Sequence, residues 1–379
     1  MLILKRLIKY GFIFGLLIGL VHLVHAISLD RITEFRRAAI YSPAWPQELC
    51  GYRIAFIADT HVISDRRLFA IVDRLNNWQP DLVLLGGDMM VGRGTGGPYR
   101  HTLGVLAGIN AADGIFGVDG NHDHAGRLFA GMEYFGIIPL DNEGRLIRPG
   151  FYLAGVADLW NRRPDVAAAI ADAPPDSFVL VLSHNPDVAM RQDMSGVDLM
   201  LAGHTHGGQI NFLGLWAPYF TFTRHLTAYG QRFVSGWARG LGDVPVYVTR
   251  GAGSYMPRVF ARPQAVLLTM HHGNDIYLAD SPGLFGEGAG VVIGFVIIWN
   301  ILVFAIYSSD KRRAIQGRRR ISEGDLLACA AIFGGIGALI ATQTLRHKTR
   351  HKIFRAIVPV AAILTAAAII WLLHQYGII

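Results

Sequence analysis

Five short apolar runs in the middle of the chain each end in a polar or glycine-rich turn. The runs cover residues 52–61, 80–90, 114–123, 177–186 and 197–206. Each run predicts a buried strand whose carboxyl end delivers Asp, Asn or His. Between the first two, the stretch SDRRLFAIVDRLNNW has helical spacing, with Ser64 or Asp65 as its cap. Strands that alternate with helices predict a layered α/β core, in which ligands gather at the carboxyl ends of the strands.

The ends of the five runs supply polar side chains of the types that bind metal ions. These residues are Asp59, His61, Asp88, Asn121, His122, His184, His204 and His206. Taken alone, one such strand end, for example GHTHGGQI at residues 203–210, could equally be a polar turn with two solvated histidines. Five successive strand ends of this kind are much harder to attribute to chance. The set as a whole therefore favours a metal site.

Asp88 is the natural residue to join two metal ions. Gly86 and Gly87 precede it, so the backbone can approach the site closely. Two divalent cations about 3.5 to 4 Å apart need a shared carboxylate, and oxygen ligands mixed with imidazoles suit Mn, Fe or Zn. A water between such cations loses a proton near neutral pH and attacks phosphorus as a metal-bridged hydroxide. Cys50 and Cys329 are the only cysteines, which excludes a CxxC zinc site and a disulfide framework.

The motifs D-T-H, G-D, G-N-H-D, S-H-N-P and G-H-T-H, in this order, resemble those of the calcineurin-like metallophosphoesterases over residues 50–272. The resemblance implies a layered α-β-β-α sandwich of two mixed sheets. It implies that a first metal ion is held by Asp59, His61, Asp88 and His206, and a second by Asp88, Asn121, His184 and His204. It also implies that His122 contacts the phosphate and protonates the leaving oxygen, and that Asp123 orients His122.

Three stretches indicate which branch of this superfamily the chain resembles. GHTHGGQI, APYFTFTRHLTAYG and YVTRGAGS are similar to membrane-anchored bacterial phosphoesterases of this superfamily rather than to its Ser/Thr phosphatases. Some of these relatives cleave cyclic nucleotides, and others cleave the pyrophosphate of nucleotide-linked lipids. The stretch RGAGSYMPRVFARP departs from the expected pattern, in which a second glycine-rich turn leads into paired prolines. Its Arg250 and Arg258 are expected to be solvated loop residues, with a phosphate clamp as the alternative.

The apolar content of the chain indicates membrane segments. A mean hydropathy of +0.34 and a hydrophobic content of 52% exceed what a soluble enzyme usually shows. The candidate spans are the uncharged runs 10–29, 288–309, 326–345 and 356–373. Lys5, Arg6 and Lys9 precede the first run, so the start of the chain is expected to stay in the cytoplasm. An uncleaved anchor is favoured, while Val24 and Ala26 also suit a signal-peptidase site.

The end of the chain carries most of its excess charge. From residue 284 onward there are eleven Lys and Arg residues against four acidic residues, a net charge of +7 that equals the net charge of the whole chain. The basic residues lie in two clusters, 310–320 and 345–355, which are typical of cytoplasmic loops and of contacts with anionic lipids. The motifs D-K-x-x-A, R-I-x-E and R-H-K-T resemble a small membrane domain without an established activity, over residues 288–376. The topology beyond residue 325 stays open, because the glycine-rich third run suits either a span or a re-entrant segment.

These observations predict three parts: a transmembrane anchor or signal at 1–29, a metallophosphoesterase domain at 30–283, and a membrane domain with two or three transmembrane helices at 284–379. The expected protein is a multi-pass enzyme of the cell membrane with an extracytoplasmic, periplasmic catalytic domain. It hydrolyses a phosphodiester or pyrophosphate bond, in a nucleotide- or lipid-linked substrate, with two divalent metal ions (Mn, Fe or Zn). The alternatives are a phosphomonoesterase and a non-catalytic membrane sensor that binds metal or phospholipid. Membrane lipids are expected partners, a nucleic-acid polymer is not, and no protein partner is identifiable.

Overall fold

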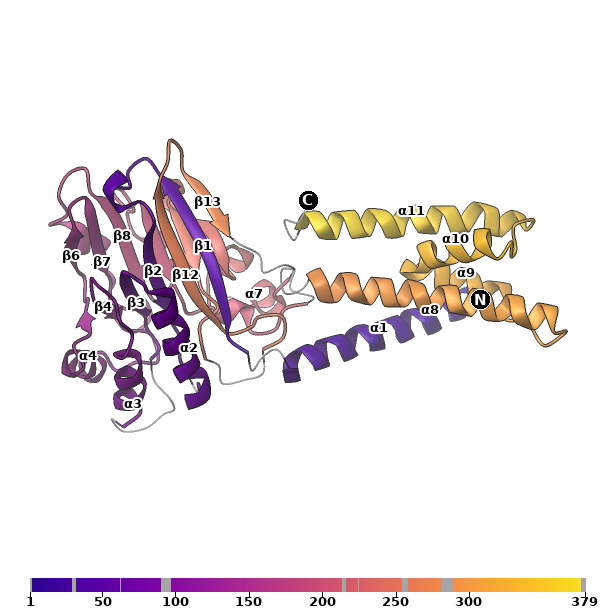
Figure 1. Ribbon diagram of the computed structural model, residues 1–379, viewed down its shortest axis with the longest axis horizontal. Helices are drawn as coiled ribbons and strands as arrows, with labels where there is room; N and C mark the ends of the chain where they lie inside the picture. The colour runs from indigo at the N-terminus through magenta and orange to yellow at the C-terminus, as the bar shows by residue number, and fades with distance from the viewer. Residues whose placement is uncertain are drawn as a thin grey trace. The chain divides into compact units, whose positions relative to one another are not determined.

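The computed structural model describes residues 2–28, 32–61, 63–89, 97–212, 216–223, 225–253, 258–280 and 289–375. The chain separates into two compact units, which we call the catalytic unit (Ala26–Gly283) and the membrane unit (Met1–His25 together with Leu284–Ile379). The catalytic unit contains both β-sheets, and the membrane unit is helical (Figure 1).

The first sheet of the catalytic unit has seven strands. In sheet order they are β13 (Tyr277–Asp280), β1 (Glu34–Ser42), β12 (Gln264–His272), β2 (Tyr52–Ile57), β3 (Leu82–Gly86), β4 (Ile115–Val118) and β5 (Ile138–Pro139). The four strands from β2 to β5 are parallel to one another, whereas β12 is antiparallel to β2 and β13 is antiparallel to β1. The sheet is therefore mixed, and its parallel half carries three of the predicted strand ends.

The second sheet has six strands. In sheet order they are β10 (Gly236–Arg239), β11 (Pro245–Val248), β9 (Leu199–Ala202), β8 (Phe178–Ser183), β7 (Phe151–Gly155) and β6 (Glu143–Arg148). The central strands β11, β9, β8 and β7 are parallel, and the two edge strands are antiparallel to their neighbours. The other two predicted strand ends belong to β8 and β9.

Alternate side chains of each strand enter different layers of the core. On β2, Ile54 and Phe56 pack between the two sheets with Leu180 of β8, while Ala55 and Ile57 face the helices on the outer side. A third cluster covers the outer face of the second sheet. The resulting order of helix, sheet, sheet and helix confirms the predicted fold class, and it explains why these strands are continuously apolar.

Helices α2 (Asp65–Trp78), α3 (Gly97–Leu106) and α4 (Ala125–Tyr134) cover the seven-stranded sheet (Figure 1). Helices α5 (Val166–Ile170) and α6 (Val188–Arg191) pack on the six-stranded sheet. The predicted helix at 64–78 is confirmed as α2, with Ser64 as its N-cap residue. Its buried residues Leu68, Ile71, Val72 and Leu75 follow the i, i+3, i+4, i+7 spacing of one helix face. Shorter elements are α7 (Pro218–Phe222), η2 (Gln47–Leu49), η3 (His206–Gly208), η4 (Gly230–Phe233) and η5 (Leu241–Asp243).

The described part of the membrane unit contains α1 (Leu2–Ser28) as far as His25, α8 (Ala289–Ile315), α9 (Glu323–Cys329), η6 (Ala330–Gly334), α10 (Gly335–Thr344) and α11 (Lys352–Gln375). Among the described residues, four helical segments are long and apolar enough to cross a membrane, namely Ile8–Ser28, Ile293–Ile315, Glu323–Thr344 and Lys352–His374. Each overlaps one of the four apolar runs of the sequence, and the second extends beyond its run into the first basic cluster.

The third of these segments is interrupted in its middle. Ile332 and Phe333 leave the helical conformation, and Phe333 has a φ of 53°. Helix α8 supplies the missing hydrogen bonds, because Trp299 Nε1 donates to the carbonyl of Ile332 (2.6 Å) and Asn300 Nδ2 donates to that of Phe333 (2.9 Å). Irregular backbone at membrane depth needs such internal partners. The break therefore depends on a neighbouring helix rather than on the glycines alone.

The motif residues of the membrane unit assemble into one polar cluster. The buried carboxylate of Asp310 accepts hydrogen bonds from His347 Nε2 (2.8 Å), from the backbone N–H of Ile321 (2.8 Å) and from Arg320 (3.2 Å). Lys348 pairs with Glu323 at 2.6 Å. D-K-x-x-A, R-I-x-E and R-H-K-T thus each contribute to the same set of contacts, which connects α8, the start of α9 and the loop before α11.

Candidate metal centre

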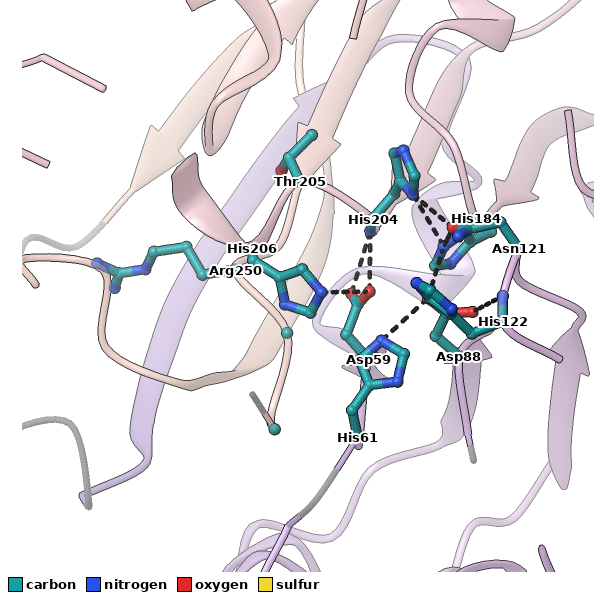
Figure 2. Close-up of polar contacts among 12 residues, drawn as sticks. Asp59, His61, Asp88, Asn121, His122, His184, His204, Thr205, His206 and Arg250 are labelled. Carbon is teal, nitrogen blue, oxygen red and sulfur yellow. Dashed lines mark hydrogen bonds and ion pairs between the residues drawn. The ribbon is translucent and has the colours of Figure 1, made fainter. Parts of the chain in front are cut away.

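All eight polar residues of the predicted strand ends lie in one region of the catalytic unit (Figure 2). Asp59 and His61 follow β2, Asp88 follows β3, and Asn121 and His122 follow β4. His184 directly follows β8, and His204 and His206 follow β9. The carboxyl ends of parallel strands from both sheets meet here, where α/β folds place their ligands.

The backbone of these strand ends is unusual in a way that brings the side chains together. Asp59, Asp88, His204 and His206 have positive φ angles between 52° and 71°. Non-glycine residues in this conformation are uncommon and gather at functional sites. Gly87, with a φ of 83°, lies so close to Gly120 that a Cβ atom there would approach the backbone nitrogen of Gly120 to 2.7 Å. The sequence predicts that the backbone before Asp88 approaches its surroundings closely. The structure shows this approach as a contact between the loops that follow β3 and β4.

One half of the centre consists of Asn121, His184 and His204. The Oδ1 atom of Asn121 lies 2.7 Å from Nδ1 of His204 and 3.0 Å from Nε2 of His184, and the two ring nitrogens are 3.2 Å apart. His184 Nδ1 donates to the carbonyl of Gly86 (2.8 Å), which leaves the lone pair of Nε2 directed at the centre. Four ligands about 2.1 Å from an ion in a tetrahedron lie roughly 3.4 Å from one another, so this spacing fits a transition-metal ion.

The other half consists of Asp59, His61 and His206, whose ligand atoms lie within 4.8 Å of one another. His206 Nε2 lies 3.7 Å from Oδ1 of Asp59, which Figure 2 shows as two facing side chains. The backbone N–H of His204 donates to both oxygens of Asp59, at 3.1 and 3.2 Å. The carboxylate is therefore held between the two histidines of the G-H-T-H motif.

Asp88 lies between the two halves. Its Oδ2 atom is 3.0 Å from Nε2 of His61 and 3.3 Å from Nε2 of His184. Its other oxygen accepts a hydrogen bond from the backbone N–H of His122 (2.8 Å). One carboxylate oxygen thus faces candidate ligand atoms of both halves.

The ionisation of the centre suits a cation. Burial raises the pKa of Asp59 to about 6. Burial acts in the same direction on Asp88, but the charge of His184 and the hydrogen bonds from His184 and His61 outweigh it and hold the Asp88 pKa well below its ordinary value. Burial and the charge of His184 lower the pKa of His204 to about 3, and burial with the nearby Arg258 guanidinium lowers that of His206. In contrast, the hydrogen bond and charge of Asp88 outweigh burial and raise the pKa of His61, and the charge of Asp88 raises that of His184. The two buried carboxylates thus favour positive charge beside them, which divalent metal ions would supply.

His122 and Asp123 occupy different environments. His122 is exposed at the mouth of the centre, and its ring lies 5.2 Å from that of His61. The Asp123 carboxylate accepts hydrogen bonds from the backbone N–H groups of Asp88 (2.6 Å), Gly120 (2.9 Å) and Met89 (3.1 Å). Asp123 therefore ties the loop of Asp88 to the loop that carries His122.

The expectation that Arg250 and Arg258 are solvated is wrong. Arg258 is fully buried, and it donates to the carbonyls of Arg250, Gly251, Gly253 and Ala261 and contacts Nδ1 of His206 at 2.9 Å. Arg250 pairs with Glu34, and its side chain points away from the centre (Figure 2). The local sequence carries no signal for these contacts, because their partners are backbone carbonyls or distant residues. Residues 254–257 of the divergent stretch lie outside the described part of the chain.

Comparisons with known proteins agree with this geometry. A family model described as calcineurin-like phosphoesterase matches residues 52–208, and one for a protein family of unknown function, DUF1294, matches residues 300–354. The chain is 28% identical to the uncharacterized metallophosphoesterase YkuE of Bacillus subtilis over 64% of this chain and 86% of that protein. It is 30% identical to the phosphodiesterase YaeI of Escherichia coli over 58% of this chain and 82% of that protein. A zebrafish (Danio rerio) transmembrane protein with a metallophosphoesterase domain is 28% identical over 55% of this chain and 50% of that protein.

Proposed function

The chain belongs to the calcineurin-like phosphoesterase family and is a phosphoester hydrolase, and from this premise we propose that it cleaves a phosphodiester or pyrophosphate bond with two divalent metal ions. The name of the Escherichia coli relative, a phosphodiesterase, supports the choice of a diester. Mn, Fe and Zn are the ions that suit this mixture of imidazole, amide and carboxylate ligands. The substrate is a nucleotide- or lipid-linked phosphoester.

This proposal rests mainly on the position of Asp88 Oδ2, which lies 3.0 Å from Nε2 of His61 and 3.3 Å from Nε2 of His184. The first ion is assigned to Asp59, His61, Asp88 and His206. The second ion is assigned to Asp88, Asn121, His184 and His204. When bound, the two ions supply Lewis acidity to the phosphoryl oxygens and lower the pKa of water enough for it to attack phosphorus.

The residues of the chain perform the remaining steps. His122 is exposed beside the ligands, so its imidazole contacts the phosphate and gives a proton to the leaving oxygen as the P–O bond breaks. The hydrogen bond from its backbone N–H to Asp88 Oδ1 sets its distance from the centre. Asp123 maintains this geometry through the backbone of Asp88 and Gly120.

The described arginines of the loop after β11 support a diester rather than a monoester as the substrate. A monoester carries more negative charge on its phosphate, so a monoesterase needs further cationic side chains beside its metal ions. The two arginines of the adjacent loop are used elsewhere, because Arg250 pairs with Glu34 and Arg258 binds backbone carbonyls. A phosphomonoesterase remains the second candidate, and substrate comparison separates the two.

The apolar helical segments of the membrane unit support a reaction at a bilayer. Lys5, Arg6 and Lys9 before the first apolar helix, and the basic residues after α8, are expected on the cytoplasmic side. The protein is then a multi-pass protein of the cell membrane, and the catalytic unit between these segments lies on the extracytoplasmic, periplasmic side. The basic residues at the ends of the helices attract anionic lipids, so membrane lipids are partners.

The experiment that separates a catalyst from a metal-binding sensor is the His122→Ala substitution in the full-length protein in detergent. We expect the rate of diester hydrolysis to fall at least about 100-fold, because general acid catalysis is lost, while the bound Mn²⁺ stays unchanged. His101→Ala, which removes another exposed imidazole, serves as the control and should retain the rate. An unchanged rate in His122→Ala would exclude the role assigned to His122.

A further inference from the structure

Trp160 lies at the edge of the metal centre, in the loop between β7 and α5. Its indole ring is 4.5 Å from the ring of His204, with an angle of 83° between the ring planes. The residue is nevertheless 45% exposed. A large aromatic side chain thus borders the Asn121, His184 and His204 half of the centre while part of its surface faces solvent.

The loop that carries Trp160 is fixed by hydrogen bonds. The buried carboxylate of Asp158 accepts from the backbone N–H groups of Trp160 (2.9 Å) and Asn161 (2.8 Å). Asn161 Nδ2 donates to the backbone carbonyl of Asn121 (2.5 Å). Arg162 forms ion pairs with Asp119 and Asp141, which lie on neighbouring loops. The position of Trp160 relative to Asn121 and His204 is therefore set before any substrate binds, which lowers the entropy cost of using it for binding.

The proposed roles of the centre's other side chains do not include a contact with the groups attached to the phosphate. The carboxylates and imidazoles of the centre are candidate metal ligands, and metal ions contact the phosphate rather than the groups attached to it. An exposed indole loses contact with water when a planar ring covers it, and base–aromatic stacking is strong enough to change affinity about 5- to 100-fold. The ligand that fits Trp160 is therefore a planar ring at a short distance from the phosphate.

We propose that Trp160 is a specificity-determining residue that stacks against a planar ring carried by the group esterified to the scissile phosphate. This inference rests on the proposed function, since it assumes that the phosphate lies at the metal centre. It narrows the substrate class to phosphoesters with an aromatic or nucleobase-like substituent on the side of the Asn121, His184 and His204 half.

The test compares two inhibitors that differ only by the ring. Thymidine 5′-monophosphate and 2-deoxyribose 5-phosphate share the phosphate and the sugar, and only the first has a base. Their inhibition constants are measured on the full-length protein with Mn²⁺ and ethyl p-nitrophenyl phosphate as the substrate, and their affinities are measured directly by calorimetry. We expect the wild type to prefer the thymidine compound about tenfold. Trp160→Ala should remove this preference, and Trp160→Phe should keep most of it.

Two controls separate stacking from a structural effect on His204. Bound Mn²⁺ is measured in each variant, and Trp216→Ala removes a second partly exposed tryptophan (38%), which packs against Phe222 instead. Equal affinity of the wild type for both compounds, a preference that survives in Trp160→Ala, or an equal loss of both affinities would overturn the proposal. Absence of turnover in the wild type would count against the proposed function, while the calorimetric comparison would still decide the role of Trp160.

Discussion

The Nη2 atom of Arg258 lies 2.9 Å from Nδ1 of His206, so a buried guanidinium supports a histidine whose other nitrogen faces Asp59. Residues that contact the second nitrogen of a metal-binding histidine orient the ring. Arg258 also donates to the carbonyls of Gly251 and Ala261, and it thereby holds the loop that follows β11.

Replacing Arg258 by Gln should weaken the binding of one of the two metal ions. We expect the Mn²⁺ affinity of the weaker site to fall about 10- to 100-fold, as is usual for residues that orient metal ligands. The melting temperature should also fall, because each buried carbonyl left without its hydrogen-bond donor lowers the free energy of unfolding by about 1 to 3 kcal/mol. Metal titration by calorimetry measures the first effect, with Arg262→Gln in the same loop as the control. An unchanged titration would show that Arg258 does not support His206.

Removal of metal should lower the stability of the catalytic unit. The carboxylates of Asp59 and Asp88 are buried together, and a cation that binds only the folded chain stabilises it by about 2.7 kcal/mol at a concentration 100 times its Kd. The melting temperature of the full-length protein should drop on chelation and recover with Mn²⁺. Asp88→Asn should abolish most of this metal-dependent shift, whereas Asp73→Asn on the exposed side of α2 should retain it. A shift of equal size in Asp88→Asn would argue against the bridging role.

The polar cluster of the membrane unit should be required for its stability. Asp310 is buried and accepts from three groups, so Asp310→Leu leaves His347, Arg320 and the N–H of Ile321 without their acceptor. We expect a lower melting temperature of the protein in detergent and earlier aggregation on size-exclusion chromatography. The matched control is Asp275→Leu, an exposed position of the catalytic unit. Equal behaviour of the two variants would mean that the cluster contributes little to stability.

The orientation of the catalytic unit can be tested with topology reporters. Alkaline phosphatase, which is active only outside the cytoplasm, should be active when fused after residue 283. A cytoplasmic fluorescent reporter fused after residue 320, at the end of the first basic cluster, should be bright. The opposite pattern would place the active site in the cytoplasm.

Local patterns are sufficient to predict the five strands that carry the metal-ligand candidates, namely β2, β3, β4, β8 and β9, but not the remaining strands of the two sheets. Asp88, His184 and His204 each lie within two residues of the end of a strand, and the fold brings parallel strand ends together, so sequence spacing carries most of the geometry. Arg258 and Trp160 could not be found this way. The contact of Arg258 with His206 joins residues 52 positions apart, and that of Trp160 with His204 depends on how one loop folds over another.

In the membrane unit, too, local sequence patterns predict the helices but not the contacts between them. The apolar runs predicted the four candidate spans, because length and composition decide whether a helix can cross a membrane. The interruption at Ile332 and Phe333 cannot be predicted from the glycine-rich run, because it depends on donors from Trp299 and Asn300 in another helix. The buried Asp310 cluster likewise joins three short motifs whose mutual contacts no local pattern records.

The most direct test of the central claim is hydrolysis of bis(p-nitrophenyl) phosphate by the full-length protein, with Mn²⁺ and after chelation, alongside the Asp88→Asn variant and p-nitrophenyl phosphate as the monoester. We predict Mn²⁺-dependent cleavage that is faster for the diester and is lost in Asp88→Asn. No turnover of either compound by protein shown to hold two Mn²⁺ ions, or undiminished cleavage in Asp88→Asn, would contradict a two-metal phosphodiesterase centred on Asp88.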